Sequence, residues 1–186
     1  MYPGNASAGC DGATANLAAM TFLESSAVQR AFKALLLAVV SLYFGLVALG
    51  NLTAWGINYP FVGHVMAMDT VFPGNPLTWR AIHDPLLWRV SYALLIAWEC
   101  AAFLFTALAA GRFAGAVRRP EAEPAARRLA CNALVFGLLL WLGAFITIGG
   151  EWFQMWQSRE WNGVDAALRN FACQALVLLY VNQPTE

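Results

Sequence analysis

Four long apolar segments alternate with polar connectors along the 186-residue chain. They cover about residues 31–55, 89–110, 129–149 and 165–181. About 20 helical residues cross a 30 Å hydrocarbon core, because an α-helix rises about 1.5 Å per residue. The first three segments reach this length, whereas the fourth is shorter and carries Arg169 near its start. The pattern predicts four transmembrane helices.

The composition favours a lipid environment over a large soluble core. The chain is 60% hydrophobic and 12% charged, whereas soluble domains average about 45–50% apolar and about 25% charged residues. Only helices or closed barrels satisfy the backbone within lipid. We therefore predict an all-α membrane protein in which residues 30–186 form one antiparallel four-transmembrane-helix bundle. The net charge of zero gives no electrostatic basis for binding nucleic acid.

Residues 1–29 are small and polar and precede the first apolar segment. They lack the succession of basic residues, apolar run and cleavage site that defines a signal peptide. We expect this segment to be a flexible arm. Met1 and Met20 are both candidate start residues.

Two polar connectors are expected on the outer membrane surface. Residues 56–88 contain four prolines, and the pieces 61–69 and 77–84 are each compatible with a short interfacial helix. Residues 149–163 concentrate three of the eight tryptophans between two apolar segments. Trp rings gather at the headgroup level of a bilayer, so this stretch reads as a connector at the membrane surface.

The basic residues predict the orientation of the bundle. On one side lie Arg30, Lys33, Arg112, Arg118, Arg119, Arg127 and Arg128, and on the other lie Arg80, Arg89, Arg159 and Arg169. Cytoplasmic loops carry the excess of Lys and Arg. Both termini should therefore be cytoplasmic, and the 56–88 and 150–164 connectors should face outward.

Glu99 lies ten residues into the second apolar segment, near the bilayer midplane. An unpaired carboxylate at this depth costs several kcal/mol, so an intramembrane carboxyl group suggests function. Counting depth along antiparallel helices brings Tyr43 and Gln174 to similar levels. Glu99 could be a structural clasp hydrogen-bonded to one of them, or a site for a proton, a quinone or a partner subunit.

A second candidate site lies in the tryptophan-rich connector. Glu151, Gln154 and Gln157 recur at helical spacing, and so do Trp152 and Trp156. If the third helix continues through them, the polar residues share one face and the tryptophans another. They would form an interfacial belt, or a docking face for the 56–88 connector or another subunit, with Arg80 or Arg169 balancing Glu151. The candidate docking residues are His64, Asp69, Arg80, Glu151, Trp152, Gln154, Trp156, Gln157, Trp161, Asn162 and Arg169.

Catalytic and metal chemistry have little support in the sequence. No GxSxG, Walker or HExxH motif is present. Both histidines, His64 and His83, lie in the 56–88 connector, whereas transmembrane haem is normally held by histidines inside the bundle. A surface metal site that combines them with nearby carboxylates has no supporting ligand spacing. We therefore predict no metal site and no catalytic residues.

Four motifs are distinctive: NLTAWGINYPFVGHVMAMDTVFP (51–73), WRAI (79–82), AWE (97–99) and IGGEWFQMWQSREWNG (148–163). They resemble a bacterial family of predicted small integral membrane proteins of unknown function. The resemblance covers about residues 30–181 and leaves the N-terminal arm outside the family pattern. It implies four transmembrane helices and a bacterial cell (inner) membrane location. It implies no activity.

We expect a non-enzymatic accessory subunit of a larger membrane complex, such as a respiratory or other energy-converting complex. Its partners would be other membrane-protein subunits and lipid. The alternative is a membrane protein that handles a quinone, another small molecule or protons at Glu99. No cofactor is predicted, although a bound lipid or quinone would be compatible with either function.

Overall fold

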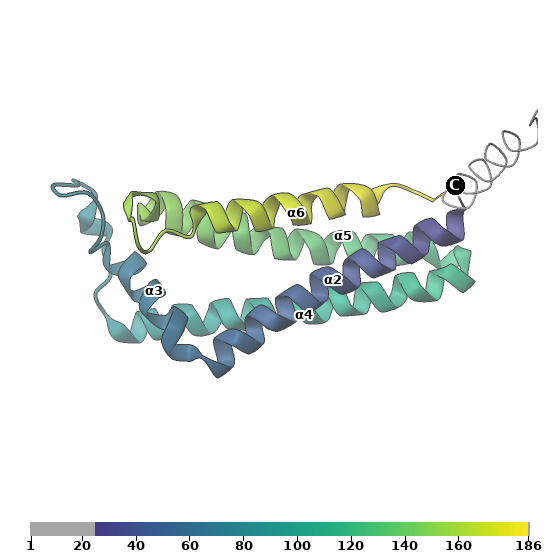
Figure 1. Ribbon diagram of the computed structural model, residues 1–186, viewed down its shortest axis with the longest axis horizontal. Coiled ribbons are helices and arrows are strands. Elements are labelled where there is room, and N and C mark those ends of the chain that lie inside the picture. Colours follow the sequence, from purple (N-terminus) through teal and green to yellow (C-terminus); the bar gives the residue numbers. More distant parts are fainter. Residues whose placement is uncertain (1–24, 186) are drawn as a thin grey trace, which may run out of the picture.

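Four long helices form an antiparallel bundle in the computed structural model, which describes residues 25–185 (Figure 1). They are α2 (Ser26–Thr53), α4 (Pro85–Arg118), the helical segment Pro120–Trp152, and α6 (Val164–Asn182). Each is long and apolar enough to cross a membrane. Over the described residues the chain contains no strand. The predicted all-α four-transmembrane-helix fold is confirmed.

The helices extend beyond the predicted apolar segments. The arm predicted for residues 1–29 lies mostly outside the described residues, but α2 already begins at Ser26. The arginine-rich stretch 111–128 is almost entirely helical, because Arg and Ala are good helix formers and continue the helices into water. The break falls at Arg119, since a residue before proline disfavours the helical conformation.

Neighbouring helices in the sequence are neighbours in the bundle. Helix α2 packs along α4, α4 along α5 (Glu123–Leu139), and α6 along α5 and the segment that continues it. Small residues permit the close approach: a Cβ atom on Gly45 would lie 3.0 Å from the ring of Phe103. Both termini of the bundle and the α4–α5 turn lie at one end, and both outer connectors lie at the other (Figure 1).

The third span changes its helical form halfway. After Leu139 the helix widens into the π-helical segment η3 (Leu140–Trp152), in which the backbone N–H of Phe153 donates to Ile148 O at 3.0 Å, five residues back. Gln154 then adopts a left-handed conformation with φ 56° and starts the short 3₁₀ turn η4 (Met155–Gln157). The third helix therefore does not continue through residues 151–157, because Gln154 leaves the right-handed helical conformation.

The first outer connector also differs from the prediction. A break at Ala54 separates α2 from α3 (Trp55–Ala67), which is longer than the expected helix over 61–69. The expected helix over 77–84 is reduced to one 3₁₀ turn, η1 (Thr78–Arg80). Asp84 precedes a proline and is therefore extended, and its side chain caps α4 by accepting from the backbone N–H of Leu86 at 2.8 Å.

Candidate functional site

Glu99 is buried in the bundle, with 3% of its surface exposed. It lies in the middle of α4 and faces α2, where the side-chain nitrogen of Asn51 donates to Glu99 Oε2 at 2.8 Å. Asn51 is buried as well. A helix–helix hydrogen bond therefore holds the carboxyl group, and residues 25–185 form no ion pair with it.

Asn51 connects Glu99 to two further polar side chains. Its oxygen Oδ1 accepts hydrogen bonds from Asn58 Nδ2 at 2.7 Å and from the Tyr92 hydroxyl at 3.2 Å. These two bonds orient the amide, with its oxygen toward α3 and its nitrogen toward Glu99. We call Asn51, Asn58, Tyr92 and Glu99 the Glu99 network.

Local structure explains how these residues meet. Tyr92 and Glu99 are seven residues apart on α4, about two turns, so they project from the same face. The break at Ala54 folds α3 back over the end of α2, which brings Asn58 to Asn51. The ring of Trp55 packs edge-on against Tyr92 at a centroid distance of 4.4 Å and supports its position.

The Glu99 network lines a cavity of about 350 Å³, which we call the Glu99 cavity. Residues from α2, α3, α4, η3 and α6 form its walls, and the aromatic ones are Tyr43, Phe61, Tyr92, Trp141 and Phe145. Glu99 is the one charged side chain among its lining residues. The second carboxylate oxygen, Oε1, has no hydrogen-bond partner among residues 25–185.

The structure separates the three residues expected to meet at this depth. Tyr43 lines the Glu99 cavity together with Asn170 of α6, but no hydrogen bond joins it to Glu99 within the described residues. Gln174 lies elsewhere in the core, where its side-chain nitrogen donates to Leu134 O at 3.2 Å and its oxygen is buried without a partner. The expectation that Tyr43 or Gln174 clasps Glu99 is therefore wrong, and Asn51 holds this position.

Asn51 is not among the site residues predicted from the sequence. A signal was nevertheless available. Asn51 and Asn58 are seven residues apart, and so are Tyr92 and Glu99. Four polar residues paired at two-turn spacing near the same end of the bundle predict a shared polar layer.

A second, apolar cavity of about 250 Å³ adjoins the Glu99 cavity. The two cavities share the side chains of Phe61, Val62, Leu95 and Phe145 as lining residues. The apolar cavity extends between α3, α4 and η3, and no charged residue lines it. Polar and apolar space therefore lie next to each other inside the half of the bundle that adjoins the 56–88 connector and the tryptophan-rich connector.

All the candidate docking residues except Arg169 belong to the 56–88 connector and the tryptophan-rich connector, which pack against each other. Gln157 Oε1 accepts from the backbone N–H of Phe72 at 2.9 Å and from Asn75 Nδ2 at 3.1 Å. The His64 ring stacks on Trp161 at 4.5 Å and its Nδ1 lies 2.8 Å from Asp69 Oδ2. Much of the tryptophan-rich connector thus contacts the 56–88 connector.

The remaining docking candidates have separate roles. Arg80 lies over the Trp152 ring at 4.7 Å and donates to Trp152 O at 3.3 Å. Within the described residues, Glu151 forms no ion pair with Arg80 or with Arg169. Arg169 is exposed on α6. Gln154 Nε2 donates to Glu151 O, the Trp156 ring packs against Phe72, and Asn162 Oδ1 accepts from the backbone N–H of Val164.

Over residues 25–185, no three His, Cys, Asp or Glu side chains are grouped to hold a metal ion.

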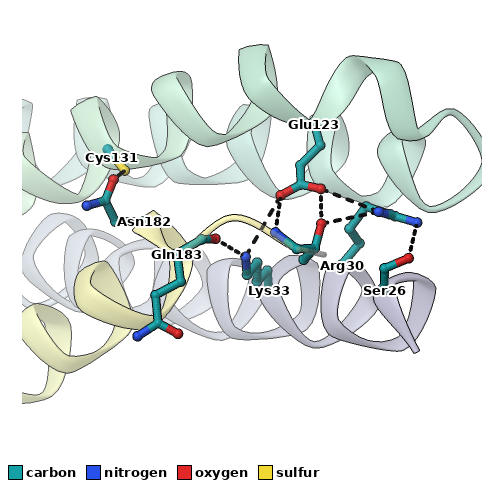
Figure 2. A network of polar contacts seen from close by, with 8 residues as sticks. Ser26, Arg30, Lys33, Glu123, Cys131, Asn182 and Gln183 are labelled. Carbon is teal, nitrogen blue, oxygen red and sulfur yellow. Dashed lines mark hydrogen bonds and ion pairs between the residues drawn. The ribbon is translucent and has the colours of Figure 1, made fainter. Parts of the chain in front are cut away.

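A buried ionic cluster closes the opposite end of the bundle (Figure 2). Arg30 and Lys33 of α2 face Glu123 of α5, with Arg30 Nη1 at 3.4 Å and Lys33 Nζ at 4.0 Å from its carboxylate. The backbone N–H of Thr185 donates to Glu123 Oε1 at 3.1 Å, and Lys33 donates to Gln183 O. In the sequence, Arg30 and Lys33 served only to predict the orientation of the bundle. In the structure they are buried, and their cluster with Glu123 connects the C-terminal residues to α2 and α5.

The fold and its buried polar layer define a small helical integral membrane protein with four candidate spans. Residues 29–184 match the family described as "Predicted small integral membrane protein (DUF2165)", and the chain belongs to this family. The resemblance seen in the motifs is confirmed. No curated protein and no solved structure matches the chain significantly.

Proposed function

We propose that the protein binds a small molecule inside the membrane, in the Glu99 cavity. The observation that carries this proposal is the combination of a buried carboxyl group, an unpartnered carboxylate oxygen and adjoining empty space. An ionisable residue inside a membrane bundle is costly, and such residues usually mark substrate, ion or proton sites. A purely structural clasp would not need the cavity.

The size and lining of the cavity support this proposal. Ligand pockets usually measure about 300–1,000 Å³ and combine apolar walls with a few polar groups. At about 350 Å³, the Glu99 cavity is large enough for one small ring or a short-chain compound. The adjoining apolar cavity provides space for an apolar substituent. A quinone headgroup is therefore one of the compounds to test.

The experiment uses the full chain, purified in mild detergent and reconstituted in lipid nanodiscs. Small molecules that copurify are extracted and identified by mass spectrometry, and a panel of short-chain quinones, phenols, alcohols and amines is screened by thermal unfolding. We expect at least one compound to stabilise the wild-type protein and to lose this effect in Glu99→Gln. Glu151→Gln removes an exposed carboxylate and serves as the matched control. If no compound stabilises the wild type, or if Glu99→Gln responds equally, the proposal fails.

A second candidate function is that of an accessory subunit of a larger membrane complex. It is supported by three exposed tryptophans on the outer connectors, Trp79 (71% exposed), Trp152 (46%) and Trp156 (46%). Tryptophan and arginine are common anchors at protein interfaces, and Arg80 lies between Trp79 and Trp152. Pull-down from native membranes in mild detergent should then recover a stoichiometric partner that Trp79→Ala weakens. Recovery of the chain alone would contradict this function.

We also propose a bacterial inner-membrane location with both termini cytoplasmic. The end of the bundle that holds the termini also holds five arginines between residues 111 and 128, and the positive-inside rule assigns such an end to the cytoplasm. Topology reporters fused after Gly74 and at the C-terminus test this orientation. The Gly74 fusion should report the periplasm and the C-terminal fusion the cytoplasm. The reverse pattern would overturn the orientation.

A further inference from the structure

We infer that the ligand of the Glu99 cavity is an organic ammonium ion whose N–H groups pair with Glu99. This inference rests on the proposed function and adds the chemical class of the ligand. It follows from three features of the cavity: its charge, the hydrogen-bonding groups that remain free, and its aromatic walls.

When Glu99 is ionised, no charged side chain that lines the cavity compensates it. Glu99 is its one ionisable carboxyl group, and Lys, Arg and His are absent from its lining residues. Asn51 supplies a neutral hydrogen bond, which stabilises the carboxylate without cancelling its charge. No ion pair to Glu99 occurs within the part of the chain that the structure describes. A buried carboxylate of this kind is matched best by a cation in the cavity.

The free hydrogen-bonding groups of the Glu99 network include two acceptors. The Asn51 oxygen accepts two bonds and its nitrogen donates one bond to Glu99, so this amide has no acceptor left for a ligand. Asn58 donates to Asn51, which leaves its own side-chain oxygen as an acceptor beside the cavity. With Glu99 Oε1, the network therefore offers two acceptor oxygens. A primary ammonium group carries three donors and no acceptor, so it complements this arrangement.

The walls complete a site for an organic cation. The rings of Phe61, Tyr92, Trp141 and Phe145 line the same cavity, and aromatic faces attract ammonium groups. Trp141 is held between Phe44 and Phe145, with centroid distances of 6.1 and 5.4 Å, so its indole is a firm part of the wall. A neutral compound of the same shape would fill the space but leave Glu99 without a counter-charge.

Paired ligands of equal shape test the charge directly. The full chain in nanodiscs is titrated with 2-phenylethylamine and with 2-phenylethanol, and intrinsic tryptophan fluorescence reports binding. Methylammonium and tetramethylammonium probe smaller and rounder cations. We expect the amine to bind at least about tenfold more tightly than the alcohol. Glu99→Gln should remove this preference without weakening the alcohol, and Glu151→Gln should behave as wild type.

The outcomes distinguish the ammonium inference from the proposal that the Glu99 cavity binds a small molecule. Equal affinity for the amine and the alcohol overturns the ammonium inference and leaves small-molecule binding intact. Binding of quinones or alcohols with no binding of any ammonium ion also overturns the ammonium inference and leaves small-molecule binding intact. Wild-type protein that unfolds cooperatively but binds no compound overturns both proposals. The paired titration uses wild-type protein, so it decides the question even if Glu99→Gln fails to fold.

Discussion

Asn51 of α2 donates its side-chain hydrogen bond to Glu99 of α4 at 2.8 Å, and both residues are buried. The same amide accepts from Asn58 and Tyr92, so one asparagine joins α2, α3 and α4. This hydrogen bond joins α2 to α4, and the two residues that form it also line the Glu99 cavity. A structural role and a binding role for Glu99 are therefore compatible, because Oε2 serves the first and Oε1 is free for the second.

Replacing Asn51 should destabilise the bundle. Asn51→Leu keeps a similar volume but leaves Glu99, Tyr92 and Asn58 without their shared partner. Loss of a partner for buried polar groups costs about 1–3 kcal/mol. Thermal unfolding in detergent should show a lower midpoint for this variant. Asn132→Leu, at an exposed position of α5, is the control and should stay close to wild type, and equal midpoints for both variants would contradict the role of Asn51.

Gly137 should tolerate no side chain. A Cβ atom there would lie 2.9 Å from Phe44 Cζ and closer still to Gln174 Nε2, where α5 meets α2 and α6. We expect Gly137→Ala to lower stability by about 1–3 kcal/mol, as for other overpacked cores. Gly115→Ala in α4 is the matched control, because nothing lies within 4 Å of its added Cβ. Alanine should stabilise that helix by about 0.5–1 kcal/mol, so the two variants should shift the unfolding midpoint in opposite directions.

Length and hydropathy were sufficient to predict the spans. Each apolar segment had to cross one bilayer, and the short connectors left an antiparallel bundle as the simplest arrangement. The helix ends were harder to predict, because apolarity stops at the membrane surface while helix propensity does not. Helix α4 accordingly continues to Arg118, well past its apolar stretch, and stops only before Pro120.

The partner of Glu99 could not be obtained from depth alone. Depth counting treats each span as a straight, independent rod, and it placed Gln174 at the level of Glu99. The break at Ala54 redirects the chain and turns Asn58 toward Asn51, and counting depth along straight helices does not show this turn. Similarly, the helical spacing of Glu151, Gln154 and Gln157 lost its meaning once Gln154 took a left-handed conformation, which non-glycine residues rarely adopt.

The ionic cluster at the other end should anchor the C-terminal residues. In Glu123→Gln, the buried Arg30 and Lys33 lose their counter-charge, and Thr185 loses a charged acceptor. Removing one partner of a buried ion pair costs about 3–5 kcal/mol. We expect a lower unfolding midpoint and faster hydrogen exchange at the Thr185 amide. Glu121→Gln, an exposed carboxylate in the 3₁₀ turn η2 (Pro120–Ala122), should change neither quantity. Unchanged exchange at Thr185 in Glu123→Gln would contradict the anchoring role.

Gln157 should hold the two outer connectors together. Its Oε1 accepts from the backbone N–H of Phe72 and from Asn75, and its Nε2 donates to Gln154 Oε1 at 3.1 Å. Gln157→Leu removes all three bonds, so the Phe72 amide should exchange with solvent faster while the amides of α4 keep their protection.

Gln157→Glu tests the side-chain oxygen of Gln157 separately from its nitrogen. The glutamate still presents an oxygen to Phe72 and Asn75 but cannot donate to Gln154. Protection of the Phe72 amide should therefore survive in Gln157→Glu and be lost in Gln157→Leu. If both variants lose it equally, the contact with Gln154 holds the connectors. If neither does, the aromatic contact between Phe72 and Trp156 is sufficient on its own.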